Sequence, residues 1–298
     1  AARGRIVEFP SAKRVVERSL EVFRDGQHFM IAGHTGCGKT EIARHIARLW
    51  MLENGVGYDP KKETDLDEVY KRLEPEFFSG TEEATVYDLM GKLKLQPLDF
   101  SDPLKVAKKV AEFKKALSAA KVKRKITDDE IIKYLTSQAS VTETWFSYGP
   151  LGRAIKNDRP LVIDELNMLP KEVQARMNDI LLRPDGAKIT LQENGAEEFV
   201  KRRGTRIIAT LNVGLQYTGT SDFNVAFGQR WKGEAMDYPS AAESYDLMLA
   251  QLMRHDRVRL PEKFPPELFG KIADLAISAR EIQELFSGKT ATKRYMSL

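Results

Sequence analysis

Eight residues near the start of the chain combine glycines with a lysine and a threonine at a spacing that suits an anion. The stretch GHTGCGKT runs from Gly33 to Thr40 and has the pattern G-x-x-x-x-G-K-T. Glycines let a backbone curl so that its N–H groups point inward at a phosphate, and the following helix presents its positive end to the same place. In such a loop Lys39 would reach the β- and γ-phosphates, and the Thr40 hydroxyl would be a ligand of Mg²⁺. The pattern therefore predicts a site for a nucleoside triphosphate and its metal ion.

The segments on both sides of this loop give it the context that phosphate loops require. HFMIAG, at 28–33, predicts a short buried strand, and EIARHIARLW, at 41–50, repeats apolar residues at helical spacing. A simple surface turn is the other interpretation of clustered glycines, but a strand before the loop and a helix after it favour the phosphate loop. The residues expected to contact the nucleotide are Gly33, His34, Thr35, Gly36, Cys37, Gly38, Lys39, Thr40 and Glu41.

A pair of acids follows a second apolar run. In RPLVIDELNML the run 161–163 predicts a buried strand, and it ends in Asp164 and Glu165. Ligands of α/β sheets bind at the carboxyl ends of the strands. Asp164 is thus expected to hold Mg²⁺, and Glu165 to polarise the attacking water as a general base. An acidic helix start would give the same pair, but the phosphate loop favours the catalytic interpretation.

Three further polar residues stand near predicted strand or helix ends. Asn212 closes the apolar run of TRIIATLNVG, where an amide could orient the water or touch the γ-phosphate. Asn is also common at ordinary strand ends. Arg230, in FNVAFGQRW, and Arg280, in ISARE, are typical of surface residues when each is considered alone.

Composition restricts the class of protein without naming a partner. The 298 residues are 42% hydrophobic and 30% charged, and no apolar run approaches the ~20 residues that span a bilayer. The single cysteine allows no internal disulfide, which suits a cytoplasmic protein, and the four histidines show no metal-ligand spacing. A net charge of +4 does not decide for or against nucleic acid.

The charge is distributed unevenly. Residues 105–125 carry nine basic side chains and one acid, while Val106, Val110, Phe113 and Leu117 fall on one helical face. This pattern predicts an amphipathic helix with a basic outer surface. Such a surface can be merely solvated, or it can contact an acidic partner or nucleic acid.

Alternating strand and helix patterns predict an α/β fold with a parallel sheet between helices. The strands are expected near 28–33, 84–89, 160–164 and 206–211, with a fifth, weaker pattern at 232–238.

Two segments are expected to interrupt or extend this pattern. A nucleotide-binding domain is predicted over 1–238, with a basic helical insert at about 92–141, and a helical lid over 239–298. A β-hairpin is expected at about 187–203, where the pair Asn194-Gly195 is typical of a two-residue turn. A second hairpin is expected around TVYDLMGKLKLQP.

The order of these stretches, from about residue 10 to 285, resembles the AAA+ ATPases, and among them the MoxR-like, dynein-related group. The stretches that carry the resemblance are GHTGCGKT, TVYDLMG, YGPLGRAIKNDRPLVIDELNML, RIIATLNVGLQYTG, FNVAFGQRW and ISARE. It implies a P-loop AAA+ fold with a five-stranded parallel sheet and a small C-terminal helical lid. The segment 92–141 is longer than in typical members, which leaves the subfamily open.

The resemblance also implies a role for each matching residue. Lys39 and Thr40 correspond to Walker A, Asp164 and Glu165 to Walker B, and Asn212 to sensor 1.

Two arginines gain roles only through the resemblance. Arg230 corresponds to the arginine finger, which acts on the neighbouring subunit's nucleotide, and Arg280 to sensor 2 in the lid. Members usually form rings of six and often act with a separate chain that carries a von Willebrand A domain.

The leading hypothesis is an ATP-hydrolysing, Mg²⁺-dependent, ring-forming ATPase that acts like a chaperone and remodels or assembles a protein partner. The alternative is a nucleic-acid-dependent motor or a nuclease-associated NTPase that uses the basic insert. A structural ring that rarely hydrolyses nucleotide is a third class, against which Glu165 argues, and the chain has no N-K-x-D guanine motif.

Overall fold

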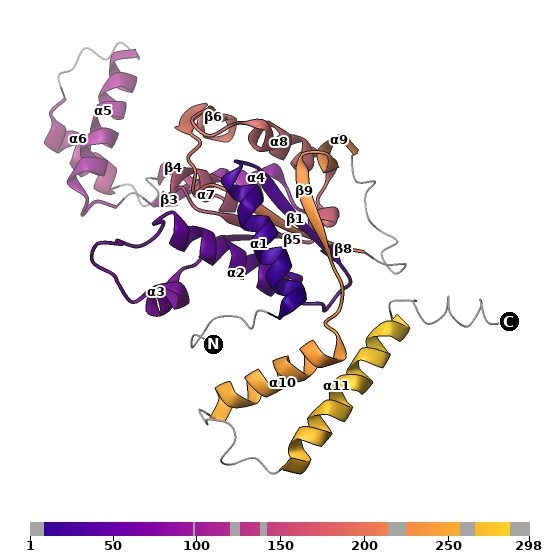
Figure 1. The fold of residues 1–298 in the computed structure, drawn as a ribbon. Helices are drawn as coiled ribbons and strands as arrows, with labels where there is room; N and C mark the ends of the chain where they lie inside the picture. Colours follow the sequence, from indigo (N-terminus) through magenta and orange to yellow (C-terminus); the bar gives the residue numbers. More distant parts are fainter. Residues whose placement is uncertain are drawn as a thin grey trace.

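A five-stranded parallel sheet forms the centre of the computed structural model, which describes residues 9–97, 99–119, 126–137, 142–213, 225–256 and 266–286. The strand order is β2-β5-β8-β1-β9, and Figure 1 shows β1, β5, β8 and β9 of this sheet. These strands are β1 (His28–Gly33), β2 (Glu76–Ser79), β5 (Leu161–Asp164), β8 (Ile207–Asn212) and β9 (Trp231–Met236). All neighbouring strands run parallel, so their carboxyl ends meet at one edge.

Helices cover both faces of this sheet, and the strand residues alternate between them. Helices α1 (Pro10–Arg24) and α2 (Lys39–Glu53) share one apolar core with Val162 and Ile208. Leu161, Ile163 and Ile207 belong to the other core, together with residues of α7 (Pro150–Lys156) and α8 (Lys171–Leu182). The inner strands β1, β5 and β8 are mainly apolar because both of their faces are covered. The predicted α/β fold is therefore confirmed, and the weak pattern at 232–238 marks the edge strand β9.

One expected strand is wrong. The structure has helix α4 (Val86–Met90) where a strand was expected near 84–89. Thr85 caps this helix by accepting a hydrogen bond from the Asp88 N–H, while the Asp88 carboxylate accepts one from the Thr85 N–H. This reciprocal capping box stabilises a helix start. The sheet contains β2 in place of the expected strand. Strand β2 lies nearer the N-terminus than 84–89 and follows α3 (Leu66–Arg72).

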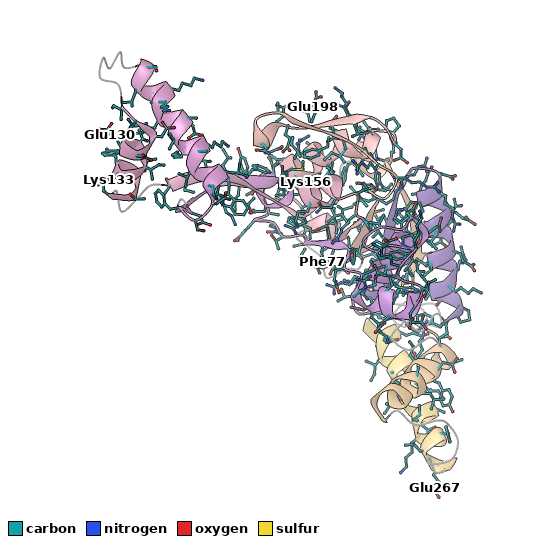
Figure 2. The ribbon with its side chains drawn as sticks, turned by 90° about the vertical axis from the view of Figure 1, so that its left-hand side faces the viewer. Phe77, Glu130, Lys133, Lys156, Glu198 and Glu267 are labelled. Carbon is teal, nitrogen blue, oxygen red and sulfur yellow. The ribbon has the colours of Figure 1, made fainter. Side chains whose placement is uncertain are left out.

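The segment at about 92–141 is more than a helical insert. Strand β3 (Gly91–Pro97) pairs antiparallel with β4 (Thr142–Tyr148), and between them lie α5 (Pro103–Ala119) and α6 (Asp128–Ser137). These two helices pack on each other through a small core of their own, formed mainly by Val110, Ile131 and Leu135. The end of the predicted basic helix, at 120–125, lies outside the described residues. The β3–β4 ribbon and its two helices project from the sheet domain as an arm (Figures 1 and 2).

A second antiparallel pair, β6 (Lys188–Leu191) and β7 (Glu197–Val200), occupies the segment expected to form a hairpin. Its turn is longer than the expected two residues. The 3₁₀ turn η2 (Gln192–Asn194) comes first, and Gly195 and Ala196 then both take positive φ.

Two helices form the C-terminal part of the described chain. A linker after β9 leads to α10 (Ala241–Asp256), which packs against α11 (Pro266–Phe286). They lie at the opposite end of the sheet domain from the arm, as the positions of Glu267 and Glu130 in Figure 2 show. Among the described residues, no helix is both long enough and apolar enough to cross a bilayer.

Candidate functional site

The glycines of the loop 33–40 are required by its backbone and by its packing. Gly36 and Gly38 take φ values of +81° and +91°, which strain any residue that has a Cβ. Gly33 has an ordinary φ, but a Cβ there would lie 2.1 Å from the Met236 carbonyl oxygen on β9. The loop therefore curls tightly between the end of β1 and the start of α2.

Lys39 folds back over this loop. Its ammonium group donates hydrogen bonds to the carbonyl oxygens of Gly33, at 2.9 Å, and His34, at 2.6 Å. The residue is only 5% exposed, and burial lowers the pKa of its side chain, while nearby Cys37 and Asp164 raise it in part. A cation is thus placed within the loop whose pattern predicts a phosphate.

The hydroxyl of Thr40 meets the first acid of the pair directly. Thr40 Oγ1 donates to Asp164 Oδ1 at 2.8 Å, which joins two motifs that lie 124 residues apart in sequence. The Thr210 hydroxyl, from β8, also donates to Asp164. Three oxygen-bearing side chains from α2, β5 and β8 therefore converge at the carboxyl edge of the sheet.

Glu165 turns sharply out of the strand that precedes it. Its φ is +56°, a conformation that a residue with a Cβ keeps only when its surroundings hold it. The Thr210 hydroxyl accepts a hydrogen bond from the Glu165 N–H at 3.1 Å, and Asn212 Nδ2 donates to Glu165 Oε1 at 2.9 Å. Asn212 therefore fixes the direction of this carboxylate. Thr210 forms hydrogen bonds with both acidic residues, although the sequence pattern of TRIIATLNVG gave Thr210 no role.

Residues 104–231 match the family model of the AAA domain, dynein-related subfamily. Over this segment the chain is therefore similar to the AAA+ ATPases of the dynein-related group. The matched residues include Asp164, Glu165, Asn212 and Arg230, whereas the loop 33–40 precedes them and is assigned from its own pattern and geometry.

Solved structures with a similar course of the chain have low sequence identity to it. A proposed ATPase from Cytophaga hutchinsonii is 14% identical over 80% of this chain and 50% of its own, with a TM-score of 0.45. NtrX from Brucella abortus in complex with ADP is 15% identical over 90% of this chain and 46% of its own, with a TM-score of 0.44. The chain thus spans about half the length of these proteins. Comparison with curated proteins gave no match.

Arg280 approaches the loop 33–40 through an intermediary residue. From α11 it donates to the carbonyl oxygen of Tyr238 at 3.0 Å, and its Nε donates to Glu284. Tyr238 lies in the linker between β9 and α10, and its hydroxyl donates to the Thr35 carbonyl at 2.8 Å. The structure therefore connects Arg280 to the loop through Tyr238, a residue that sequence reasoning did not single out.

Arg230 lies at the far end of the sheet from the loop of its own chain. It directly precedes β9, where Trp231 pairs with His28 and Met236 pairs with Gly33. This distance along the strands is roughly 17–20 Å at the usual rise per residue. Arg230 is thus separated from the other predicted catalytic residues.

Two of the residues predicted to contact the nucleotide, Cys37 and Glu41, have positions that packing and helix formation explain. Cys37 is buried, with its Sγ 3.6 Å from the Met236 carbonyl oxygen, and burial raises the pKa of its thiol. Glu41 is exposed in the first turn of α2, where an acid favours the positive end of the helix.

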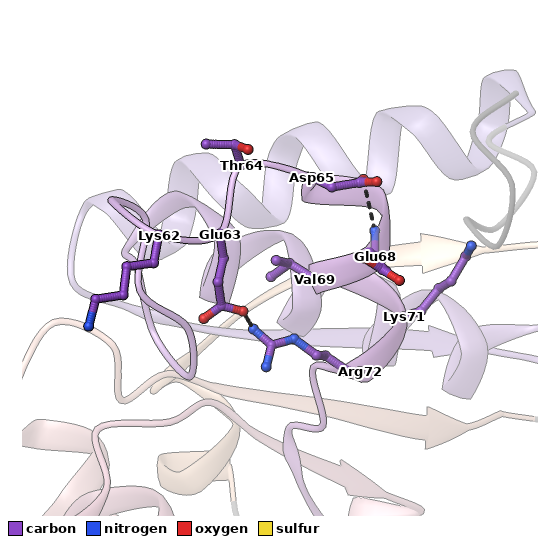
Figure 3. Close-up of a pocket in the computed structure, with 8 residues that line it drawn as sticks. All are labelled: Lys62, Glu63, Thr64, Asp65, Glu68, Val69, Lys71 and Arg72. Carbon is purple, nitrogen blue, oxygen red and sulfur yellow. Dashed lines mark hydrogen bonds and ion pairs between the residues drawn. The ribbon is translucent and has the colours of Figure 1, made fainter.

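A cavity of about 620 Å³ lies beside α3, apart from these residues (Figure 3). Charged side chains dominate its lining, which is formed by Lys62, Glu63, Thr64, Asp65, Glu68, Val69, Lys71 and Arg72. Glu63 and Arg72 pair with each other across it, and Asp65 caps α3. Its lining has three acids and three bases, and it contains none of the predicted nucleotide contacts.

Proposed function

We propose that this chain is an AAA+ ATPase domain, which hydrolyses ATP in a Mg²⁺-dependent reaction. The hydrogen bond between Thr40 and Asp164 carries the proposal, because it brings the phosphate loop and the acid pair to one place. Hydroxyl and carboxylate oxygens suit Mg²⁺, which usually keeps waters and substrate phosphates as its other ligands. In the described ranges no three His, Cys, Asp or Glu side chains are placed so that they could hold a metal ion by themselves, so the residues fit a shared Mg²⁺–nucleotide site better than an all-protein cage.

Each polar residue at this edge has a distinct task in the proposed reaction. Lys39 and the loop N–H groups bind phosphate oxygens, and Thr40 and Asp164 would hold the metal ion, which neutralises phosphate charge when bound. Glu165 accepts the proton of the water that attacks the γ-phosphorus, and the bond to the β–γ bridging oxygen breaks. Asn212 keeps the Glu165 carboxylate in position through the bond at 2.9 Å.

We further propose that the domain works in a ring, six subunits being the number that the family resemblance implies. Arg230 lies too far along the sheet to serve its own nucleotide, which supports a role in the neighbouring subunit's site. A guanidinium there can bind γ-phosphate oxygens with two N–H groups at once. Each hydrolytic site would then contain residues of two chains.

The client of this ring is proposed to be a protein, which the ring remodels or assembles; a separate chain with a von Willebrand A domain is one candidate. The arm supports a protein over a nucleic acid, since its β3 strand exposes Leu93, at 61%, and Leu95, at 72%. On α5, Lys109 pairs with Glu112 and Lys114 pairs with Asp128 of α6. Part of the basic charge is therefore neutralised within the arm.

The variant Glu165→Gln tests the reaction. It keeps the shape and the hydrogen bonding of the side chain but removes the base, so ATP turnover should fall by roughly 10²–10⁴-fold while ATP binding persists. Lys39→Ala is the matched comparison and should lose binding as well as turnover. Calorimetry and phosphate release measure the two quantities. Turnover of Glu165→Gln at the wild-type rate would show that another group is the base.

The same variant can capture the partner, because a subunit that binds ATP without hydrolysing it keeps its client. Proteins that co-purify with Glu165→Gln but not with Lys39→Ala would support the protein hypothesis. Nucleic acid that binds with a steep dependence on salt, and stimulates wild-type turnover, would favour the motor alternative instead.

A further inference from the structure

Tyr238 makes three contacts that together join the phosphate loop to the C-terminal helices. Its hydroxyl donates to the Thr35 carbonyl oxygen at 2.8 Å. Its aromatic ring stacks on the His34 imidazole, with centroids 5.6 Å apart and planes inclined by 8°. Its own carbonyl oxygen accepts the hydrogen bond from Arg280 on α11. The side chain thus contacts the loop, and the backbone contacts the lid.

We propose that Tyr238 is a positioning residue for nucleotide hydrolysis, which sets the conformation of the phosphate loop according to the position of α11. The proposal rests on nucleotide binding at the loop 33–40, as argued above. Tyr238 does not itself reach the acid pair; it acts through Thr35 and His34.

The hydroxyl contact orients one peptide of the loop. A trans peptide holds its C=O and N–H groups on opposite sides, so fixing the Thr35 oxygen against Tyr238 turns the Gly36 N–H away from the linker. Gly36 has a φ of +81°, so this segment can adopt other conformations at small cost if the contact is lost. Tyr238 therefore holds a flexible donor of the loop in one direction.

The stack on His34 gives the loop a second point of attachment. Offset aromatic pairs contribute stabilisation beyond the area that they bury. Because both attachments are to consecutive residues, His34 and Thr35, a movement of the linker displaces this part of the loop as a unit.

The other side of the linker is tied to the lid by different bonds. Arg280 binds the Tyr238 carbonyl at 3.0 Å and contacts that of Pro239 at 3.4 Å. Just beyond, the Glu243 carboxylate accepts hydrogen bonds from the N–H groups of Ser240 and Ser11, which holds the start of α10 against α1. The start of α10 is thus anchored independently, and Tyr238 is the described residue that bonds both to the loop and to α11.

The first experiment measures ATP affinity and turnover in Tyr238→Phe and Tyr238→Leu. Tyr238→Phe removes the hydroxyl and keeps the stack, and its affinity for ATP should fall roughly 2–10-fold, the equivalent of one net hydrogen bond. Tyr238→Leu removes both contacts and should lose more. Tyr245→Phe is the control, since no hydrogen bond of the Tyr245 hydroxyl with any described residue is present in the structure.

The second experiment measures amide hydrogen exchange of residues 33–40 and 266–286. In the wild type, ATP should slow exchange in both segments; in Tyr238→Leu it should slow exchange in the loop but not in α11. A general loss of packing would not remove the ATP response of one segment alone. Equal ATP-dependent protection of α11 in both proteins would overturn the proposal.

The nucleotide-free samples separate this proposal from the proposed function. If the wild type binds no ATP, the proposed function fails, yet the coupling is still tested: Tyr238→Leu should exchange faster than wild type in both segments. Equal rates there would overturn the coupling. Should Tyr238→Leu fail to fold, Tyr238→Phe against Tyr245→Phe gives the same comparison with a smaller expected difference.

Discussion

At the carboxyl end of the central sheet, Lys39, Asp164 and Glu165 bond to loop carbonyls and to neighbouring hydroxyl and amide groups, and the two acids stay partly exposed. At the amino end, Lys201 and Arg206 are 0% exposed. Arg206 donates to the Phe23 carbonyl and, with two nitrogens, to the Asp185 carboxylate at 2.9 and 2.6 Å. Both ends bury cations, but only at the carboxyl end do partly exposed acids lie beside a glycine-rich loop.

The difference shows that a buried charge does not by itself identify a functional site. Arg206 has protein partners for its guanidinium on several sides, so it joins α1, the loop before β6 and β8. The partners of Lys39 are two carbonyl oxygens and the Cys37 sulfur, all within a glycine-rich loop that can change partners when a phosphate arrives. Access and flexible partners distinguish the site from the structural cluster.

The largest expected effect would connect the two ends across a subunit boundary. Arg230 lies at the amino end, beside the Trp231–His28 pair. Arg230→Ala should bind ATP normally but lose turnover by roughly 10³–10⁵-fold, the usual contribution of an arginine supplied by a neighbour. This corresponds to about 4–7 kcal/mol of barrier. Phosphate release measures the loss, and Arg202→Ala, at an exposed arginine next to Lys201, is the control.

Mixing makes this prediction sharper. Arg230→Ala and Lys39→Ala subunits should each be inactive alone, but in the proposed ring a mixture would pair an intact loop with a neighbour's intact arginine. Partial activity should therefore return when subunits exchange. Exchange demonstrated by labelling without any return of activity, or full activity of Arg230→Ala as a dilute monomer, would contradict the shared site.

The next effect concerns stability and separates the two buried cations. Arg206→Leu leaves the Phe23 carbonyl oxygen without its buried donor and ends the ion pair with the exposed Asp185, so the free energy of unfolding should fall by about 1–3 kcal/mol. Lys39→Met removes a buried charge whose carbonyl partners belong to a loop that can rearrange, so its stability should equal or exceed that of the wild type. Denaturant unfolding of both variants measures the contrast. Equal loss of stability in both would mean that the two ends do not differ as argued.

Local patterns predicted most of the sheet, and they failed where a competing local signal was overlooked. The strand expected near 84–89 is a helix because Thr85 and Asp88 form a capping box, a spacing visible in the sequence. Strand β4, TETWFSY, is rich in residues that favour strands. The sequence analysis did not predict this strand, because α5 and α6 separate it in sequence from its partner β3. The whole segment was instead interpreted from its lysines as a basic helical insert.

The candidate site shows the same limit at longer range. The phosphate loop and the acid pair each follow from a contiguous motif, so their residues could be named in advance, although their catalytic roles remain predictions. Thr210 contacts Asp164 across 46 residues, and Tyr238 contacts Thr35 across 203. No local periodicity contains such a pair; only the strand order brings its members together.

The smallest expected effect is a change of stability with pH that is due to Lys201. Its origin is a chain of hydrogen bonds at the amino end of the sheet. The N–H of Ile207 donates to His28 Nδ1 at 3.0 Å, so that nitrogen carries no proton and the neutral imidazole carries its proton on Nε2. Nε2 lies 3.2 Å from Lys201 Nζ, which also donates to the Arg183 carbonyl at 2.7 Å. Only an uncharged Lys201 amine can accept a hydrogen bond from the His28 Nε2–H group.

The surroundings favour that uncharged form. Burial, and then the charge of Arg206, lowers the pKa of Lys201 to about 8, although Asp185 opposes this shift. Burial, followed by the charges of Lys201 and Arg206, holds the pKa of His28 well below its usual range. Both groups are therefore driven toward their neutral forms in the folded protein.

The sign of the pH dependence follows from comparing the folded and unfolded chains. Between pH 8 and the ordinary lysine pKa of about 10.4 the unfolded chain binds more protons at Lys201 than the folded one, so stability due to this residue rises with pH. The difference in unfolding free energy between wild type and Lys201→Met should therefore shift in favour of wild type by about 1–2 kcal/mol from pH 8 to pH 9.5. Denaturant unfolding at stepped pH measures it. Lys232→Met, at an exposed position on β9, controls for the loss of a lysine. A wild-type advantage that stays constant over this range would mean that Lys201 is charged in the fold, and the amino end would then hold a second buried cation beside the Arg206–Asp185 pair.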